Sequence, residues 1–370
     1  MRIPLLFLLL VAPVPLVAQD QETGPFGFNT LVCPANSDTI VGVPLRPNGS
    51  RQATLGAAPA VNGDAATLSI AGTPAYAVNG FVPTWYVKFS SGSKNGRFYT
   101  ITANDASTLT IKLDGDDLAG VLAGDNILIA QYWTLDSLFP PAGATTAWTG
   151  TAPDAVPNGH AIVASTSTLA GGRRTEILLS DTMGAGTNLT SPAKYYIHGG
   201  MWKLNNGGGT NRGPTTILYP DTYFRIRHPV AVTLPTKYRA QGEVEMGSFT
   251  IPLSTLATGQ GKQDNYVCIP RPVDKTLDGL NLRQSGAFVA STSTLAGGRR
   301  DELLVFDNTT ALINKSASAT YYVHNGIWKL NNGGSSDRGS VVIPAGAGFI
   351  VRKYETATGA SVFWSNTAGY

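Results

Sequence analysis

The chain is poor in charged residues, and this shortage excludes several classes of protein. Only 14% of its 370 residues are Asp, Glu, Lys or Arg, against roughly 25% in an average soluble protein. The net charge of +3 is too small to draw the chain to nucleic acid or to an anionic membrane. The 42 glycines and 23 prolines fall short of a disordered composition, and glycine lacks the three-residue period of collagen. With 42% hydrophobic residues, the composition is typical of a folded, turn-rich β protein.

The motifs of common enzymes are also missing. There is no His-Glu-x-x-His zinc motif, no Gly-x-Ser-x-Gly nucleophile elbow, no P-loop and no dinucleotide-binding glycine pattern. The acidic run at 114–117 with Asp125 could offer oxygen ligands to calcium, but its spacing is not that of an EF-hand. We therefore predict a protein that is not an enzyme and has no catalytic residue, cofactor or metal.

Only two cysteines occur, Cys33 and Cys268. They close similar apolar runs, 31–33 and 266–268, and a proline follows each run within two residues. This similarity suggests the same strand position in two related modules. In an oxidising compartment the pair could form a disulfide; the alternative is two buried free thiols. The spacing of Cys and His does not indicate a zinc site.

The first 18 residues have the pattern of a secretory signal peptide. Arg2 supplies a positive charge, residues 3–17 are apolar, and Ala18 is a small residue at the expected cleavage site. The apolar stretch is shorter than the roughly 18 residues that a membrane-spanning helix needs. We therefore expect an exported protein, located outside the cell, at the cell surface or in the periplasm. We expect no transmembrane segment after cleavage.

A long internal repeat organises the rest of the chain. Residues 163–213 align without gaps onto residues 289–339, with 31 identities in 51 positions. Twelve of these identities form one unbroken block, 163–174 in the first copy and 289–300 in the second. The cysteine precedes this block by 130 residues in the first copy and by 21 in the second. The first copy therefore contains an insertion of about 110 residues.

These patterns predict an all-β fold with two related small β-sandwich or barrel-like modules in tandem, the first interrupted by a small β-meander or barrel domain. No segment has a sustained helical period, so we expect little helix. Short alternating runs predict strands at 85–89, 97–102, 107–113 and 126–132 in the insertion, and at 177–179, 195–198, 201–204 and 223–227 in the first repeat. The predicted boundaries are a signal peptide at 1–18, the first strands of module A at 19–49, the inserted domain at 50–140, a linker and the remainder of module A at 141–260, and module B at 261–370.

Several segments resemble a known family. They are 36–44 near the N-terminus, 99–104, 109–111, 123–125, 132–135 and 138–139 in and after the insertion, and 343–349 with 351–352 near the C-terminus. Together they resemble a paralogous family of uncharacterised exported proteins of verrucomicrobial-type bacteria. The resemblance covers most of the mature chain and implies secretion and a β-rich repeat architecture. It brings no activity and no catalytic residues.

The repeat contains a cluster of residue types that suit carbohydrate binding. Tryptophan and tyrosine can stack on sugar rings, asparagine can bond hydroxyl groups, and arginine can hold a carboxylate or sulfate. Two copies would add avidity on a polymer. The same residues can equally form the core and the turns of a duplicated fold. The candidate binding residues are Arg173, Arg174, Tyr196, Trp202, Asn205 and Arg212, with their copies Arg299, Arg300, Tyr322, Trp328, Asn331 and Arg338.

Two functions are compatible with these patterns. We favour a non-enzymatic structural or adhesive protein of the cell surface or matrix, built from duplicated β modules. Its partners would be other copies of the chain or components of the cell envelope or matrix. The alternative is a polysaccharide-binding module that uses the two Trp, Tyr and Arg clusters. This alternative requires the side chains of Trp202 and Trp328 to be exposed to solvent.

Overall fold

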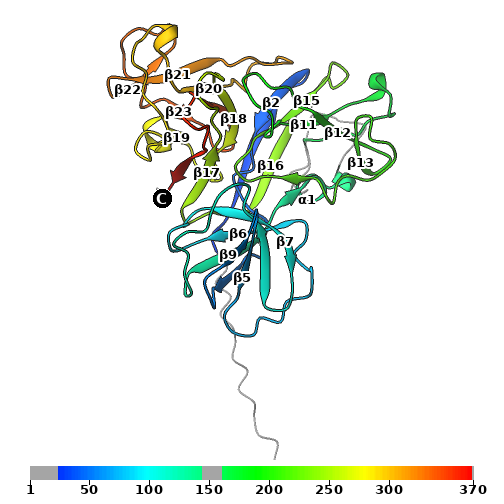
Figure 1. The fold of residues 1–370 in the computed structure, drawn as a ribbon. Coiled ribbons are helices and arrows are strands. Elements are labelled where there is room, and N and C mark those ends of the chain that lie inside the picture. The colour runs from blue at the N-terminus through cyan, green and yellow to red at the C-terminus, as the bar shows by residue number, and fades with distance from the viewer. Residues whose placement is uncertain (1–23, 144–160, 369–370) are drawn as a thin grey trace, which may run out of the picture.

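The protein is all-β, as the sequence predicts. The computed structural model describes residues 24–143 and 161–368, and its paired strands run antiparallel (Figure 1). Within these residues the only α-helix is α1 (Leu135–Leu138). No helix in the described part of the chain is long and apolar enough to cross a membrane.

Seven strands form the inserted domain, in the order β3-β9-β6-β7-β8-β5-β4. In β8, apolar and polar residues alternate, so that Leu109 and Ile111 face the core of the domain and Lys112 is exposed. The four predicted strands are confirmed as β6 to β9. Strands β3 to β5 were not predicted, because they are short and contain few large β-forming residues. The seven strands are β3 (Arg51–Thr54), β4 (Ala60–Asn62), β5 (Ala65–Ser69), β6 (Trp85–Phe89), β7 (Phe98–Asn104), β8 (Thr108–Lys112) and β9 (Asn126–Gln131).

Module A combines a five-stranded sheet, in the order β13-β12-β11-β15-β2, with a long ribbon of β1 and β16 and a short β10–β14 pair. The four strands predicted in the first repeat are confirmed as β11, β12, β13 and β15. The strands of module A are β1 (Phe26–Cys33), β2 (Ser37–Val41), β10 (Trp133–Thr134), β11 (Glu176–Leu179), β12 (Ala193–His198), β13 (Met201–Leu204), β14 (Ile217–Leu218), β15 (Phe224–His228) and β16 (Thr236–Glu243).

Module B has the same arrangement of strands. Its five-stranded sheet has the order β22-β21-β20-β24-β18, its ribbon is β17–β25, and its short pair is β19–β23. In each module the sheet and the ribbon contribute residues to one apolar core. The strands of module B are β17 (Phe249–Leu253), β18 (Gln263–Cys268), β19 (Lys275–Thr276), β20 (Glu302–Val305), β21 (Ala319–His324), β22 (Ile327–Leu330), β23 (Val342–Ile343), β24 (Gly348–Lys353) and β25 (Val362–Asn366).

Two predicted boundaries differ from this arrangement. Strand β17 precedes the predicted start of module B at residue 261, yet it pairs with β25 at the end of module B. Helix α1 falls within the predicted insertion, yet Leu135 and Leu138 lie in the core of module A. Most of the predicted linker, residues 144–160, lies outside the described residues. Sequence spacing could not place these edges, because contacts between segments that are distant in sequence decide them.

The inserted domain packs on module B although it interrupts module A in sequence. The guanidinium of Arg97 lies 3.6 Å from the ring centroid of Phe363. The ring of Phe98 is 5.1 Å from that of Phe249, between centroids. Lys88 forms a buried ion pair with Glu245 in the segment that joins the two modules. The inserted domain therefore packs against the β17–β25 ribbon (Figure 1).

The two modules differ at a buried polar position next to their cores. In module A the imidazole of His228 lies between two hydroxyl groups, 3.0 Å from Thr175 Oγ1 and 2.8 Å from Thr236 Oγ1. At the positions of Thr175 and His228, module B has Asp301 and Lys353, which form a buried ion pair. Module A thus has a neutral network where module B has two charges.

This difference predicts a pH dependence of stability that originates in module A. Burial lowers the pKa of His228 to about 4, below the value of about 6.5 expected in the unfolded chain. A lowered histidine pKa leaves stability intact above pH 6.5, and stability is lost as the pH falls toward 4 because the unfolded chain takes up the proton more readily. We expect a loss of about 3 kcal/mol over this range, measured as chemical unfolding midpoints at pH 7, 5 and 4.

The variant His228→Gln isolates this contribution. Glutamine can bond to both hydroxyl groups but does not titrate. Burial raises the pKa of Asp221 to about 6, which works in the opposite direction and is common to both proteins. An equal decline in wild type and variant between pH 7 and 4 would contradict the prediction.

Candidate functional site

The tryptophans of the predicted carbohydrate cluster are core residues. Trp202 and Trp328 are both 0% exposed. The indole N–H of Trp202 donates to the carbonyl of Phe139 at 3.1 Å, and the ring of Trp328 lies 4.9 Å from that of Phe288, between centroids. The prediction that these two side chains face solvent is wrong. Each occupies a core position of a hairpin, where a large apolar ring is needed to fill the space between sheet and ribbon.

The remaining members of the cluster divide between the two faces of the sheet. Tyr196 is buried under Arg173, whose guanidinium is 4.9 Å from the ring centroid, and Tyr322 and Arg299 repeat this contact at 4.9 Å. Successive strand residues point to opposite faces, so Arg212 meets the neighbouring tyrosine instead, in a separate hollow. Its copy is Arg338, and in both arginines Nε has no hydrogen-bond partner.

Two further pairs of predicted residues lie in turns or beside them. Ser165 Oγ and Ser291 Oγ accept the backbone N–H groups of Arg174 and Arg300, each at 3.1 Å. Asn205 and Asn331 donate their backbone N–H groups to β12 and β21, each at 2.8 Å. The structure therefore does not bring the twelve predicted residues into two binding surfaces, and neither tyrosine ring is free to stack on a sugar.

The identical twelve-residue block contains a turn with an exposed tip in each module. We call residues 165–174 and 291–300 the repeat turns. Each contains a short 3-10 helix, Ala170–Gly172 or Ala296–Gly298. Leu169 and Leu295 lie at their tips, each 75% exposed. The internal hydrogen bonds also match, since Arg173 and Arg299 each donate to a turn carbonyl at 3.2 Å.

The two five-stranded sheets meet through the faces that point away from their cores. Strand register places four residues in one row on module A: Lys194, Leu178, Arg225 and Ile40. The equivalent row on module B is Thr320, Leu304, Ile350 and Tyr266. Ile40, Tyr266, Leu304 and Ile350 belong to a single apolar cluster. The interface is therefore apolar at its centre, and only the row of module A is cationic.

Each module also sends a loop across to the other. Arg227 and Asp38 of module A form a two-bond ion pair, with both N–O distances 2.7 Å. Asn314 of module B accepts a further bond from Arg227 Nη2 at 2.6 Å and donates its backbone N–H to Asp38 at 2.9 Å. Paired hydrogen bonds between arginine and carboxylate are among the strongest polar contacts in proteins.

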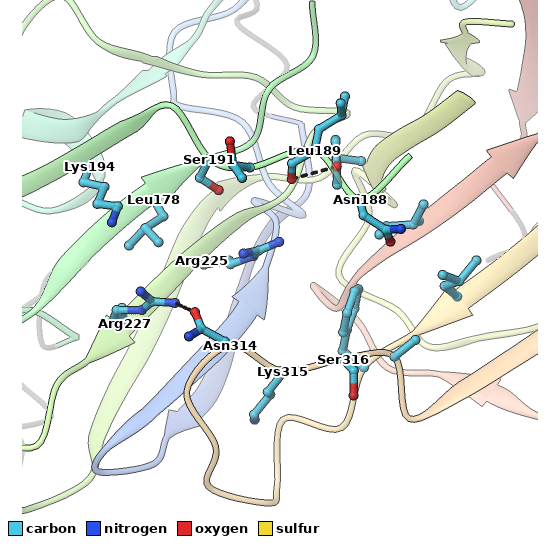
Figure 2. Close-up of a pocket in the computed structure, with 16 residues that line it drawn as sticks. Leu178, Asn188, Leu189, Ser191, Lys194, Arg225, Arg227, Asn314, Lys315 and Ser316 are labelled. Atoms are coloured by element: carbon cyan, nitrogen blue, oxygen red, sulfur yellow. Dashed lines mark hydrogen bonds between the residues drawn. The ribbon is translucent and has the colours of Figure 1, made fainter. Parts of the chain in front are cut away.

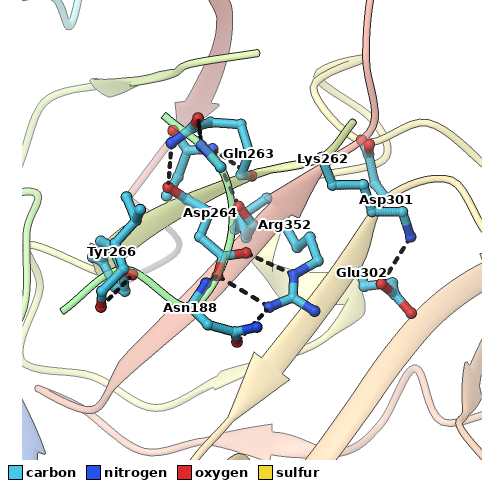
Figure 3. Close-up of polar contacts among 12 residues, drawn as sticks. Asn188, Lys262, Gln263, Asp264, Tyr266, Asp301, Glu302 and Arg352 are labelled. Atoms are coloured by element: carbon cyan, nitrogen blue, oxygen red, sulfur yellow. Dashed lines mark hydrogen bonds and ion pairs between the residues drawn. The ribbon is translucent and has the colours of Figure 1, made fainter. Parts of the chain in front are cut away.

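The reciprocal contact has the same plan. Arg352 and Asp264 of module B are joined by bonds of 2.7 and 3.0 Å. Asn188 of module A accepts from Arg352 at 3.1 Å and donates its backbone N–H to Asp264 at 2.7 Å (Figure 3). Asn188 and Asn314 occupy equivalent positions and share a left-handed backbone, with φ of 56° and 58°. The modules are thus related by an approximate two-fold axis. We call the two equivalent contacts, each made of an Arg–Asp ion pair and an asparagine of the other module, the two locks.

Near this axis, a residue of module A faces the residue at the equivalent position of module B. In each of two such pairs, one of the two residues is glycine. Cys268 is the counterpart of Gly42, and a Cβ added to Gly42 would lie 2.1 Å from Cys268 Sγ. Tyr223 is the counterpart of Gly348, where an added Cβ would lie 2.4 Å from the Cβ of Tyr223. Two identical large side chains would collide at either position, so the modules have different residues there.

This geometry corrects the interpretation of the cysteines. Both are buried and free, so the disulfide alternative is wrong and the two-thiol alternative is confirmed. They do not occupy equivalent positions, because Cys33 ends β1 whereas Cys268 ends β18, the counterpart of β2. Burial raises the pKa of the Cys33 thiol to about 11, which makes it unreactive at neutral pH.

A groove of about 410 Å³ opens between the two rows (Figure 2). We call it the inter-module groove. Four cations and no Asp or Glu line it. Arg227 is paired as described, and Lys315 Nζ donates to the carbonyl of Asp307 at 2.7 Å. Arg225 Nε has no hydrogen-bond partner, and the Lys194 ammonium makes no contact with a described carboxylate. Within the described part of the chain, therefore, no acidic side chain neutralises Arg225 or Lys194 in the groove.

The acidic run that suggested calcium is engaged by cations of the protein. Asp116 pairs with Lys94 and Arg97 and accepts from the hydroxyl of Tyr99 at 2.7 Å. Asp117 pairs with Lys94 at 2.6 Å. Over the residues that the structure describes, no group of three or more His, Cys, Asp or Glu side chains could hold a metal ion.

No sequence pattern predicted the inter-module groove or the Arg, Asp and Asn residues that join the two modules beside it. One signal was available, since Phe224-x-x-Arg227 and Phe349-x-x-Arg352 correspond in the repeat. It could not have revealed the groove, because the asparagines that complete each lock come from the opposite module.

Comparison with protein-family models, with curated proteins and with solved structures finds no match for this chain. The functional inference therefore depends on the geometry of the repeat turns and of the inter-module groove.

Proposed function

We propose that the protein is an exported, non-enzymatic structural or adhesive protein that contacts a repetitive partner through its two repeat turns. The observation that carries this proposal is that ten of the twelve consecutive identities fall in the repeat turns, whose tips are exposed. In the rest of the repeat about half of the positions are identical. Buried positions do change, since Ile177 corresponds to Leu303 and Ile197 to Val323. Packing therefore does not account for the identity of the turns.

Part of the turn sequence has a local structural role. A Cβ added to Gly172 would meet Ser167 Oγ at 2.1 Å, and one added to Gly298 would meet Ser293 Cβ at 2.5 Å. The exposed leucine at each tip has no such role. An exposed apolar side chain repeated in two identical turns supports a contact surface for a partner that offers the same feature twice.

The partner class follows from this bivalence. A second copy of the chain, an assembly of cell-envelope components and a polysaccharide all present repeated features. The expectation of export supports an extracellular setting for each of them. The buried Trp202 and Trp328 cannot stack on a sugar, so within the identical block a polysaccharide would have to be held by the turn residues.

The experiment compares the mature chain with the double variant Leu169→Ser/Leu295→Ser. We expect concentration-dependent oligomers in sedimentation velocity, or saturable binding to immobilised neutral, uronic or sulfated polysaccharide. The double variant should lose this association, and each single variant should lose more than half of the apparent affinity because bivalence is gone. Val78→Ser removes a side chain of similar exposure, 72%, from the inserted domain and serves as control. A wild-type chain that stays monomeric and binds nothing, or a double variant that associates normally, would refute the proposal.

A further inference from the structure

We infer that the inter-module groove binds an amphipathic organic anion, with its charged head group at Arg225 and Lys194 and its apolar part against module B. This site is separate from the repeat turns and does not depend on the adhesive proposal. Its volume of about 410 Å³ lies within the roughly 300–1,000 Å³ that is usual for small-molecule sites.

The charge on the module A side is not compensated. Register places Lys194 on β12 and Arg225 on β15, the two strands that flank β11, with Leu178 between them. The two like charges lie on one face of the sheet, two strand spacings or about 10 Å apart, and an anion above Leu178 would be attracted by both. None of the described residues that line the groove is acidic, so none supplies that charge. A ligand with a sulfate, phosphate or carboxylate group would supply this negative charge.

A second feature lies beside Arg225, whose positive charge also acts on it. The hydroxyl of Tyr223 is buried and has no hydrogen-bond partner. A buried hydroxyl without a partner costs free energy, and burial raises the pKa of Tyr223, so this group stays protonated and able to donate. Its ring contacts those of Tyr266 and Phe306, which line the groove.

The opposite wall suits an apolar group. Ile350 is the counterpart of Arg225, and Phe306 is the counterpart of Ser180, so module B is apolar at these two positions where module A is polar. Leu304 and Tyr266 extend this wall. The approximate two-fold symmetry is therefore broken in charge along the two strand rows, where module A has Lys194 and Arg225 and module B has no cation; Lys315 is the one cation that module B adds to the lining. An inorganic anion would use only one side.

The experiment titrates the full mature chain with three probes by isothermal calorimetry. Octyl sulfate, below its micelle concentration, has both head and tail. Octyl glucoside has the tail with a neutral head, and inorganic sulfate has the head alone. We expect saturable binding of octyl sulfate at one site, and at least tenfold weaker binding of the other two.

The variants copy the residues of module B and are therefore expected to fold. Arg225→Ile and Lys194→Thr should each weaken octyl sulfate about ten- to a hundredfold, the range of one charge-assisted hydrogen bond. Phe306→Ser, which copies module A, should weaken octyl sulfate but leave the weak binding of inorganic sulfate unchanged. Arg51→Ile removes a strand arginine from the inserted domain and should change nothing.

Thermal unfolding midpoints confirm that each variant is folded before titration, and Lys194→Thr keeps the test decisive if Arg225→Ile does not fold. Equal binding of octyl glucoside would overturn the role of the anion. Equal binding of inorganic sulfate would overturn the role of the apolar wall. Unchanged octyl sulfate affinity in the folded cation variants would overturn the site itself.

Discussion

Replacing Gly42 with alanine is expected to destabilise the interface between the two modules by about 3 kcal/mol, the upper end of the usual cost of overpacking. The added Cβ would lie 2.1 Å from the sulfur and 2.2 Å from the Cβ of Cys268, closer than any non-bonded contact allows. Neither residue can move away, because both are buried at the centre of the interface. Chemical unfolding followed by near-UV circular dichroism measures the effect.

A second substitution should reverse this loss. In the variant Gly42→Ala/Cys268→Gly the side chain is transferred to the other module, and the collision is removed. We expect recovery of at least half of the lost stability, since a small cavity remains where the thiol was. Gly209→Ala adds a Cβ that meets nothing within 4 Å and is the matched control. Failure of Cys268→Gly to restore any stability would show that the two modules do not face each other in this way.

Truncation of either core tryptophan is expected to cost about 3–5 kcal/mol, the range for a buried aromatic side chain replaced by alanine. Trp202 and Trp328 fill equivalent places in the two cores. Their local contacts differ, because only the indole N–H of Trp202 has a partner, at the carbonyl of Phe139. The same substitution at the two positions therefore removes the same side-chain volume, and the difference in stability between the two variants reports the hydrogen bond.

The phenylalanine variants make this comparison. Trp202→Phe leaves the carbonyl of Phe139 without its donor, whereas Trp328→Phe breaks no hydrogen bond. We expect Trp202→Phe to cost about 1 kcal/mol more than Trp328→Phe, measured by urea unfolding monitored by tyrosine fluorescence. If Trp202→Ala and Trp328→Ala were as stable as wild type, both rings would have to be at the surface, and the carbohydrate-binding alternative would regain its basis.

The strands of the repeats and of the insertion were predictable where large β-forming residues alternate with polar ones. Strand β6 at Trp85–Phe89 and strand β13 at Met201–Leu204 begin and end at the predicted residues. The short strand β4 was not predicted, because Ala60–Asn62 has no buried residue and hence no hydrophobic pattern. Alternation is visible only where one face of a strand is covered.

The candidate site was less predictable than the fold. Aromatic and arginine residues in a repeat are compatible with both a core and a binding surface, and here Trp202 and Trp328 belong to the core. The repeat turns at 165–174 and 291–300 contain the longest run of identity, but only their exposure distinguishes a contact surface from a well-packed turn. The inter-module groove could not be predicted, because its cations and its apolar wall are distant in sequence.

The sequence by itself determined that the chain is all-β and which residues of each repeat form strands, because these depend on local alternation and composition. The tertiary structure decided how the modules face each other. Asn314 lies 276 positions after Asp38, and Arg352 lies 164 positions after Asn188. A periodic pattern shows that one face of a strand is buried but not what covers it. The two locks, the unequal pairs Gly42–Cys268 and Tyr223–Gly348, and the charge asymmetry of the groove all result from contacts between modules.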